Sequence, residues 1–138
     1  RAALRAPPQD VSRLTESHEQ MAAHREAGDD AAARLEAERF PSGVIRLAGV
    51  PVLQRMVESL WLLCGPLMKG LDTHPMSQPR KQHPHLLVLR GLRRADGELA
   101  RQGVHEEIER TTAPILAYLR ERSGVAPAAR ARRAPVAV

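Results

Sequence analysis

The chain has 138 residues, 43% of them hydrophobic but only 2% aromatic, and a formal net charge of +5. This length allows one domain with its own core, and the shortage of aromatic residues favours packed helices over sheets. The single cysteine excludes an internal disulfide and a cysteine-built zinc site, and no apolar run approaches the roughly 20 residues of a membrane span. We therefore expect a reduced, cytoplasmic setting without membrane contact.

Helix-breaking residues divide the first half of the chain. The first predicted helix covers residues 8–27 and stops at Gly28. The second is capped by Asp29 or Asp30 and reaches Pro41, where the helix either kinks or restarts.

The second half begins with a helical segment over residues 44–48. The most apolar stretch, residues 51–71, follows helical spacing and is predicted to be the central helix. Residues 72–83 contain two prolines and no periodicity, which indicates the main loop. A helix over residues 84–95 and a last helix capped by Asp96 complete an all-α, antiparallel helical bundle of about six helices.

The positive charge is concentrated at the C-terminal end. Residues 120–138 carry five arginines and one glutamate, which gives +4 and leaves +1 for residues 1–119. We predict a helical domain over residues 1–122 and a disordered basic tail over residues 123–138, because the tail is rich in Ala, Pro and Arg and lacks a helical period.

One histidine lies on an apolar helix face. His85 shares this face with Val88 and Leu89, so it is either a hydrogen-bonded core residue or a ligand for something in the bundle. His85 lies 11 residues before Asp96 and Glu107 lies 11 residues after it. Eleven helical residues rise roughly 16 Å, so the two side chains are expected at one level of a hairpin. Such a pair could be half of a metal site or a buried hydrogen bond.

The remaining histidines are expected to be ordinary surface or loop residues: His18, His24, His74, His83 and His105. Of these, His83 is expected to be exposed and His18 to have no partner. No nucleophile and base stand out, because Cys64 fits an inert core thiol and the pair Glu36 and Glu38 fits a solvated face. We expect no enzymatic activity.

Three segments, in order, carry a family resemblance: "AGDDAAARLEAERFP" (residues 27–41), "LAGVPVL" (residues 47–53) and "PHLLVLRGLRRADGELARQGVHEEI" (residues 84–108). They resemble the FCD domain, the C-terminal effector domain of the FadR subfamily of GntR-type transcription regulators. The resemblance spans about residues 2–122. It implies a homodimeric domain that binds a small effector, an organic acid or related metabolite, and contacts DNA only through a winged-helix domain that would precede residue 1.

The resemblance also implies the position of the effector pocket. Many members of that family bind a metal through one Asp and three His. The Asp corresponds to Ala37 and the first His to Pro41, and the other two correspond to His85 and Glu107. Because positions 37 and 41 offer no ligand atom, we expect a degenerate site for zinc or nickel and a metal-free pocket.

Two arginines, Arg46 and Arg80, are candidate partners for a carboxylate effector, by position alone. Two alternatives stay open beside the regulator. One is a stand-alone helical bundle that acts as a protein-interaction module. The other is a small enzyme, either metal-dependent or using His85 and Glu107 as acid and base.

Overall fold

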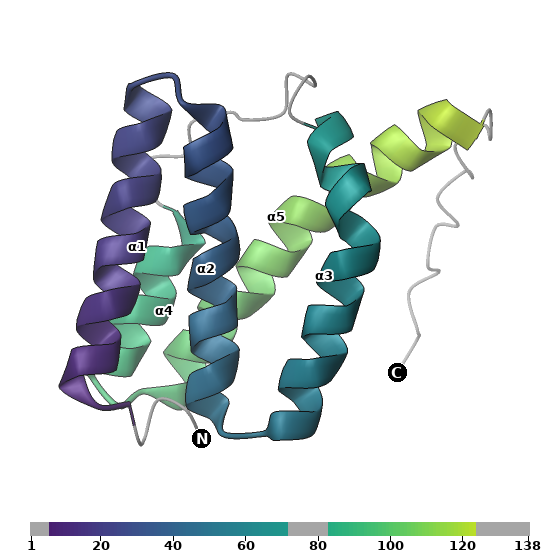
Figure 1. Cartoon of the computed structure of the whole chain (residues 1–138). Coiled ribbons are helices and arrows are strands. Elements are labelled where there is room, and N and C mark those ends of the chain that lie inside the picture. The colour runs from purple at the N-terminus through teal and green to yellow at the C-terminus, as the bar shows by residue number, and fades with distance from the viewer. Residues whose placement is uncertain (1–5, 72–82, 124–138) are drawn as a thin grey trace, which may run out of the picture.

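The computed structural model describes the backbone of residues 6–71 and 83–123, and the side chains of residues 6–63 and 83–123. The described residues form five helices and no strand (Figure 1). The helices are α1 (Pro8–Glu26), α2 (Asp30–Ala48), α3 (Pro51–Leu71), α4 (Pro84–Arg93) and α5 (Gly97–Ser123). The predicted all-α class is confirmed for this part of the chain.

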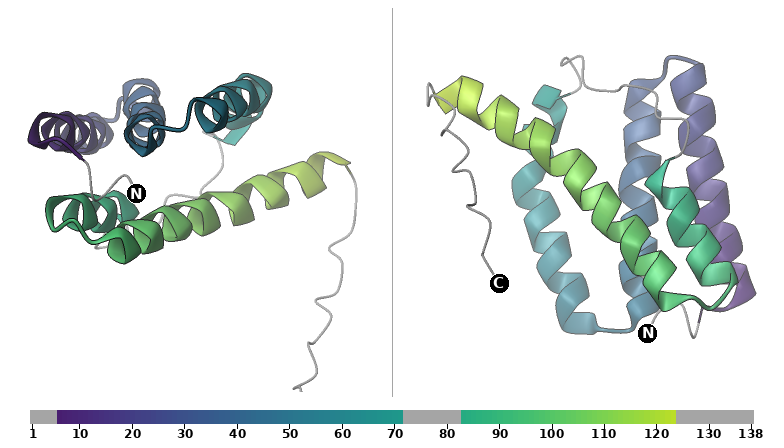
Figure 2. Two further views of the ribbon diagram at one scale, coloured as in Figure 1. Left: turned by 90° about the horizontal axis from the view of Figure 1, so that it is seen from below. Right: turned by 180° about the vertical axis from the view of Figure 1, so that it is seen from behind.

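The helices are arranged in two layers. α1, α2 and α3 lie side by side in one layer, and α4 and α5 lie behind them (Figure 2). α5 runs diagonally across the back, from the base of α1 and α2 to the far end of α3. The most extensive contacts join α1 to α2 and α4 to α5, so the fold consists of two helical hairpins with α3 beside them.

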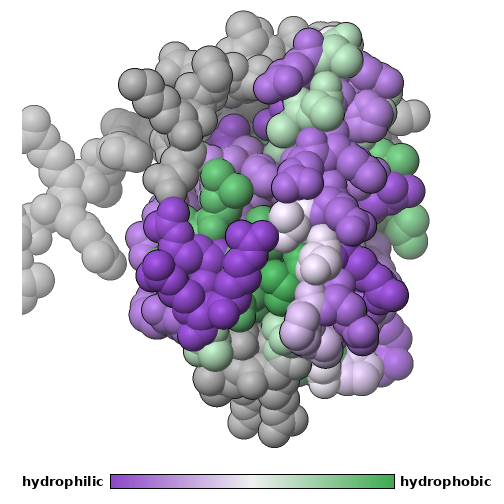
Figure 3. Space-filling view, turned by 90° about the vertical axis from the view of Figure 1, so that its left-hand side faces the viewer, coloured by the Kyte–Doolittle hydropathy of each residue, from purple (hydrophilic) through white to green (hydrophobic). Residues whose placement is uncertain are grey.

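The core lies where α1, α2 and α4 meet. Its buried residues are Val11, Leu14, Phe40, Val88, Leu89 and Leu92. The predicted apolar face of α4 is therefore buried, as expected. On the side of the molecule that carries α1, hydrophilic side chains dominate and hydrophobic ones show mainly in a narrow band between them (Figure 3).

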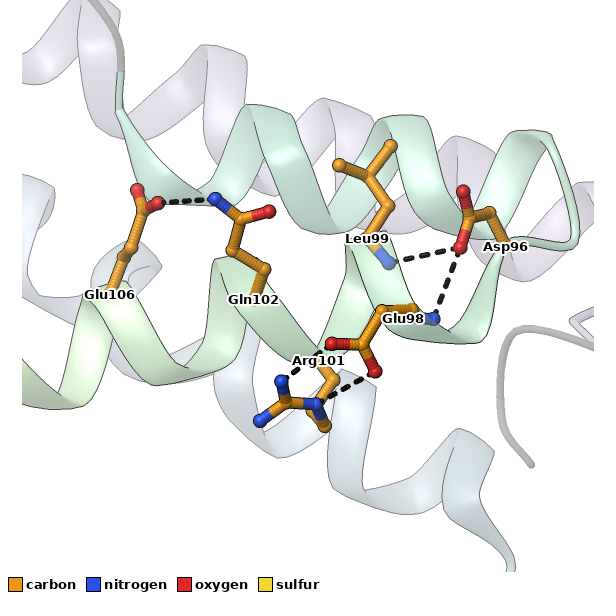
Figure 4. Close-up of polar contacts among 6 residues, drawn as sticks. All are labelled: Asp96, Glu98, Leu99, Arg101, Gln102 and Glu106. Atoms are coloured by element: carbon orange, nitrogen blue, oxygen red, sulfur yellow. Dashed lines mark hydrogen bonds and ion pairs between the residues drawn. The ribbon is translucent and has the colours of Figure 1, made fainter. Parts of the chain in front are cut away.

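Predicted caps set the ends of two helices. Gly28 has a positive φ of 75°, and the side chain of Asp29 accepts a hydrogen bond from Ala32 N at 3.0 Å. At the start of α5, Asp96 accepts bonds from the backbone N–H groups of Glu98 and Leu99 at 3.1 and 3.0 Å (Figure 4). These carboxylates satisfy amides that have no partner inside the helix, so both hairpins turn where the sequence predicts.

Two glycines let α4 and α5 approach closely. A Cβ atom added at Gly103 would lie 2.7 Å from Val88 N, and one added at Gly91 would lie 2.8 Å from Ala100 Cα. Both distances are too short for real carbon contacts, so the backbones themselves touch here. This contact fixes the register of the hairpin that carries His85 on one helix and residue 107 on the other.

Of the two alternatives expected at Pro41, a kink or a restart of the helix, the restart does not occur. Pro41 lies inside the continuous helix α2, and the segment 44–48 is its last part, so there are five described helices where about six were expected. A proline removes one helical hydrogen bond. The turns on both sides of it remain helical, since Phe40 and Gly43 are buried against the rest of the fold.

The prediction that residues 51–71 form the central helix is wrong. α3 lies at one edge of its layer, and Leu62 and Leu63 are 82% and 77% exposed. Apolar periodicity shows that a helix has an apolar face, but not which element covers that face. Here the core position is taken by α4.

Several predictions concern residues outside the described ones: the loop over residues 72–82 with His74 and Arg80, the side chain of Cys64, and the tail beyond residue 123. Among the described residues, no helix is long and apolar enough to cross a membrane.

Candidate functional site

Three histidines meet at one end of the core. His18 comes from α1, whereas His83 and His85 lie at the start of α4. The ring centroids of His83 and His85 are 4.2 Å apart, and the ring of His18 is 5.4 Å from each of them. One ring nitrogen from each residue lies within 4.8 Å of the other two. We call these three residues the histidine cluster.

The start of α4 determines how two of these side chains are placed. Pro84 is the first residue of the helix, so His83 is its N-cap, and Nδ1 of His83 accepts a hydrogen bond from His85 N at 3.3 Å. His85 points into the core and is only 2% exposed. Its ring stacks on Phe40 of α2, with centroids 3.7 Å apart and planes 8° from parallel. Phe40 therefore holds the imidazole plane in one orientation.

Several polar atoms of this region are buried without a hydrogen-bond partner among the described residues. They include Nδ1 of His18, Nδ1 of His85 and Oε2 of Glu107. A buried polar atom without a partner costs about 1–3 kcal/mol, and such atoms are rare in folded proteins. Such atoms take their remaining partners from ordered water or from a ligand, so their concentration at one place makes it a candidate binding site.

Burial keeps the histidine cluster uncharged at neutral pH. It is the main cause that lowers the pKa of His85 to about 2 and that of His83 to about 3, and it also lowers the pKa of His18. Arg25 and Arg110 lie close enough to lower the first two further. Neutral imidazoles can accept a hydrogen bond or bind a metal ion through one nitrogen and donate through the other.

Glu107 reaches the cluster from α5. Its Oε2 lies 4.0 Å from Nδ1 of His83, so the imidazole within ion-pair distance is that of His83. Burial raises the pKa of Glu107, although Arg110 and Arg25 act in the opposite direction. Glu107 thus lies beside the cluster that contains His85, but its neighbour at this distance is His83, and the expected hydrogen bond between His85 and Glu107 is not found among the described residues.

Two expectations about single histidines are wrong. The side chain of His83 was expected to be exposed, but it is only 14% exposed. His18 was expected to have no partner, but its ring lies against both other rings of the cluster. Helix spacing places residues within one element or one hairpin, whereas the meeting of α1 with α4 depends on tertiary packing. The one local signal was Pro84, which makes His83 a cap.

The other residues expected to line the effector pocket lie outside the histidine cluster. Ala37 and Pro41 are half-buried on α2, on either side of Phe40 in the chain. Arg46 borders a groove of about 800 Å³ between α1 and α2 whose described lining contains none of the clustered histidines. The cations that act on the histidine cluster are Arg25 and Arg110, which the sequence analysis did not select.

Glu36 was expected on a solvated face, but it is only 5% exposed. Its carboxylate accepts a hydrogen bond from the hydroxyl of Ser17 at 3.1 Å and pairs with Arg39. This network joins α1 to α2 one residue away from His18, so Glu36 is a structural residue and not part of a solvated pair with Glu38.

Comparison with known protein families identifies the family of this chain. The model of the FCD domain matches residues 1–110. The chain belongs to the FCD domain family. No curated protein and no solved structure gives a significant match. FCD domains are typically the effector-binding C-terminal domains of GntR-type regulators, and they are regulatory domains and not enzymes.

The ligand set that the resemblance carries over does not fit a metal in this FCD domain. Ala37 and Pro41 have no side-chain atom that could bind an ion, which leaves only His85 and Glu107. Two protein ligands are too few for a tight zinc site, which uses three or four. The histidine cluster, however, adds His18 and His83 to His85.

Proposed function

We propose that this chain is the ligand-sensing domain of a GntR-type regulator of the FadR subfamily, in which a small metabolite binds beside the histidine cluster. The observation that carries the proposal is the group of buried, unpartnered polar atoms inside a bundle of the FCD family. We further infer that a winged-helix domain makes the DNA contacts and that the regulator acts in the cytoplasm.

The charges around the cluster favour an organic acid as the effector. Arg25 and Arg110 both act electrostatically on His83 and His85, so a carboxylate bound among these rings would gain from two cations. Glu107 would repel it when ionised, but its raised pKa makes protonation easier. A protonated Glu107 could donate a hydrogen bond to the effector.

The position of the cluster suggests how binding could be transmitted. Its residues come from α1, from the start of α4 and, through Glu107, from α5, so an effector would contact both layers of the fold. A ligand that binds one arrangement of the layers better than another shifts the population toward that arrangement. In a dimer, this shift would change the separation of the two DNA-binding domains.

The proposed homodimer is supported by an apolar surface on α3. Six of its described large apolar residues are at least 42% exposed: Val52, Leu53, Met56, Leu60, Leu62 and Leu63. Exposed apolar groups gathered on one element are typical of a surface that another chain covers. The same observation supports the alternative function, a protein-interaction module. Mass measurement in solution separates the two, because a regulator of this class would be dimeric whereas the module would be monomeric until its partner is added.

The effector proposal is tested by thermal denaturation of the purified chain with a panel of small organic acids, neutral metabolites and amines. We expect an organic acid to raise the melting temperature, and the shift to disappear in His85→Ala. His105→Ala is the matched control, because His105 is an exposed histidine that pairs with Glu109 at 3.6 Å. A panel without any binder, or binding that survives in His85→Ala, would argue against the proposal.

A further inference from the structure

We propose that the groove between α1 and α2 is a second binding site, which takes a short linear peptide of about three to four residues with free termini. The proposal goes beyond effector sensing and does not depend on it. The groove has a volume of about 800 Å³, and ligand pockets usually have about 300–1,000 Å³. It is lined by one face of each helix, and no described helix lies in front of these faces (Figure 1, Figure 2). A ligand can therefore reach it from solvent.

Two contacts between α1 and α2 determine how the helices are aligned along the groove. The hydroxyl of Ser17 donates to the carboxylate of Glu36 at 3.1 Å. A Cβ atom added at Gly43 would lie 2.7 Å from Leu14 Cδ2. Because the two helices are antiparallel, positions 14–17 of α1 therefore face positions 36–43 of α2.

The charged groups without a partner are separated along this groove. Two ion pairs, each within one helix, neutralise part of the lining. Three lining residues have no ion-pair partner in the described part of the chain: Glu16, Glu38 and Arg46. Both carboxylates lie at the level of positions 36–43, whereas Arg46 lies beyond it. Positions 38 and 46 are eight residues apart. Their separation along the helix axis is therefore about 12 Å.

This spacing fits the two ends of a short peptide. The ammonium group of the peptide would lie between the carboxylates of Glu16 and Glu38. Its carboxylate would accept hydrogen bonds from the guanidinium of Arg46. An extended chain spans at most about 3.3–3.6 Å per residue, so about three to four residues cover 12 Å. A single amino acid is too short to reach both ends.

The middle of the groove offers contacts to the rest of such a peptide. The hydroxyl of Ser42 donates to the backbone carbonyl of Glu38 at 2.9 Å, and its oxygen can still accept a hydrogen bond from a peptide N–H. Two leucines of α2 also line the groove: Leu35 is 50% exposed and Leu47 is half-buried. They give small apolar side chains of the peptide a surface to pack against. These groups favour a peptide over a ligand that consists of two charges and a plain spacer.

The groove and the histidine cluster are separate sites on the same two helices. On α1, Ser17 lines the groove whereas His18 belongs to the cluster. On α2, Arg39 lines the groove whereas Phe40 stacks on the ring of His85. A peptide in the groove would therefore contact none of the three histidines, and its binding can be measured independently of any effector.

The test is an amide NMR titration of the isotope-labelled chain with tetra-alanine. The same peptide is also used acetylated at its N-terminus or amidated at its C-terminus. We expect free tetra-alanine to shift the amide signals of residues 10–20 and 35–47, and each terminal modification to weaken binding by about fivefold. Absence of binding by free tetra-alanine would overturn the proposal. So would equal affinities of the free and modified peptides, or shifts confined to α4 and α5.

Two substitutions assign the ends of the peptide to the two ends of the groove. Arg46→Gln should weaken the binding of free tetra-alanine by about fivefold and leave that of the C-amidated peptide unchanged. Glu38→Gln should weaken the free peptide and leave the N-acetylated one unchanged. Arg90→Gln is the control of equal charge, because Arg90 is exposed on α4 in the other layer, and it should keep the wild-type affinity. A loss in Arg90→Gln as large as that in Arg46→Gln would refute the assignment.

Discussion

The close contact between α4 and α5 predicts that alanine is unfavourable at Gly103. The methyl group of Gly103→Ala would lie 2.7 Å from Val88 N and 2.8 Å from Val88 Cγ2. Carbon contacts prefer about 3.5–4.0 Å, so the two helices must separate by about 1 Å to admit it. Overpacking of this kind costs about 1–3 kcal/mol.

A second glycine substitution in α5 provides a comparison without a clash. Alanine in a helix is favoured over glycine by up to about 1 kcal/mol, which offsets part of the clash. Gly97 is also in α5, but an added Cβ atom there would meet nothing within 4 Å. We therefore expect Gly97→Ala to be neutral or stabilising, and Gly103→Ala to be less stable than Gly97→Ala by about 2 kcal/mol. For a domain of this size that difference corresponds to a melting temperature lower by about 8 °C.

The assay is urea unfolding of the metal-free chain, followed by circular dichroism, with the slope of the transition compared between variants. Equal midpoints for Gly103→Ala and Gly97→Ala would refute the reasoning. The backbones of α4 and α5 would then be further apart than the structure has them. In that case the hairpin register that brings Glu107 to the histidine cluster would have no support from packing.

Three further predictions concern pH, the core and a helix cap. Because the pKa values of His83 and His85 are lowered to about 3 and 2, the unfolded chain binds more protons below about pH 6.5 than the folded chain does. The free energy of unfolding of the metal-free chain should therefore fall as the pH drops below 6.5, by up to about 1.4 kcal/mol per pH unit for each histidine. In urea titrations at several pH values, His85→Phe should depend less on pH than the wild type. Leu89 is 1% exposed and Leu62 is 82% exposed, so calorimetric melting should show a loss of about 2–5 kcal/mol for Leu89→Ala but almost none for Leu62→Ala. Asp96→Ala should cost about 1 kcal/mol in the same experiment, because two backbone amides of α5 lose their acceptor; an unchanged melting temperature would show that the cap contributes nothing.

Local patterns predict much of this fold. The breaks at Gly28 and Asp96 and the apolar face around His85 depend on a few neighbouring residues, and each of them lies where the sequence indicates. The continuity of α2 through Pro41 does not follow from the sequence in this way. A proline removes one hydrogen bond, and whether the helix continues depends on what its other side is packed against.

The candidate site is less accessible to sequence reasoning. Helical spacing places Glu107 near the level of His85, because the two are linked through one tight turn. His18 is far from both in the chain, and it joins them only because α1 packs against α4. The prediction that α3 is the central helix was wrong for the same reason. Its strong apolar period shows that the helix has an apolar face, but not which surface covers that face.

The edge position of α3 also has a consequence for motion. Local opening of a helix costs a free energy set by the contacts that it breaks, and these contacts are few for α3. Its amide hydrogens should therefore exchange with solvent sooner than those of α1, α2 and α4, which share the buried core. Within one small bundle, the hairpins that hold the histidines would remain closed while α3 opens and recloses. Whatever covers the apolar face of α3 would slow that exchange, so protection of this helix is a direct measure of assembly.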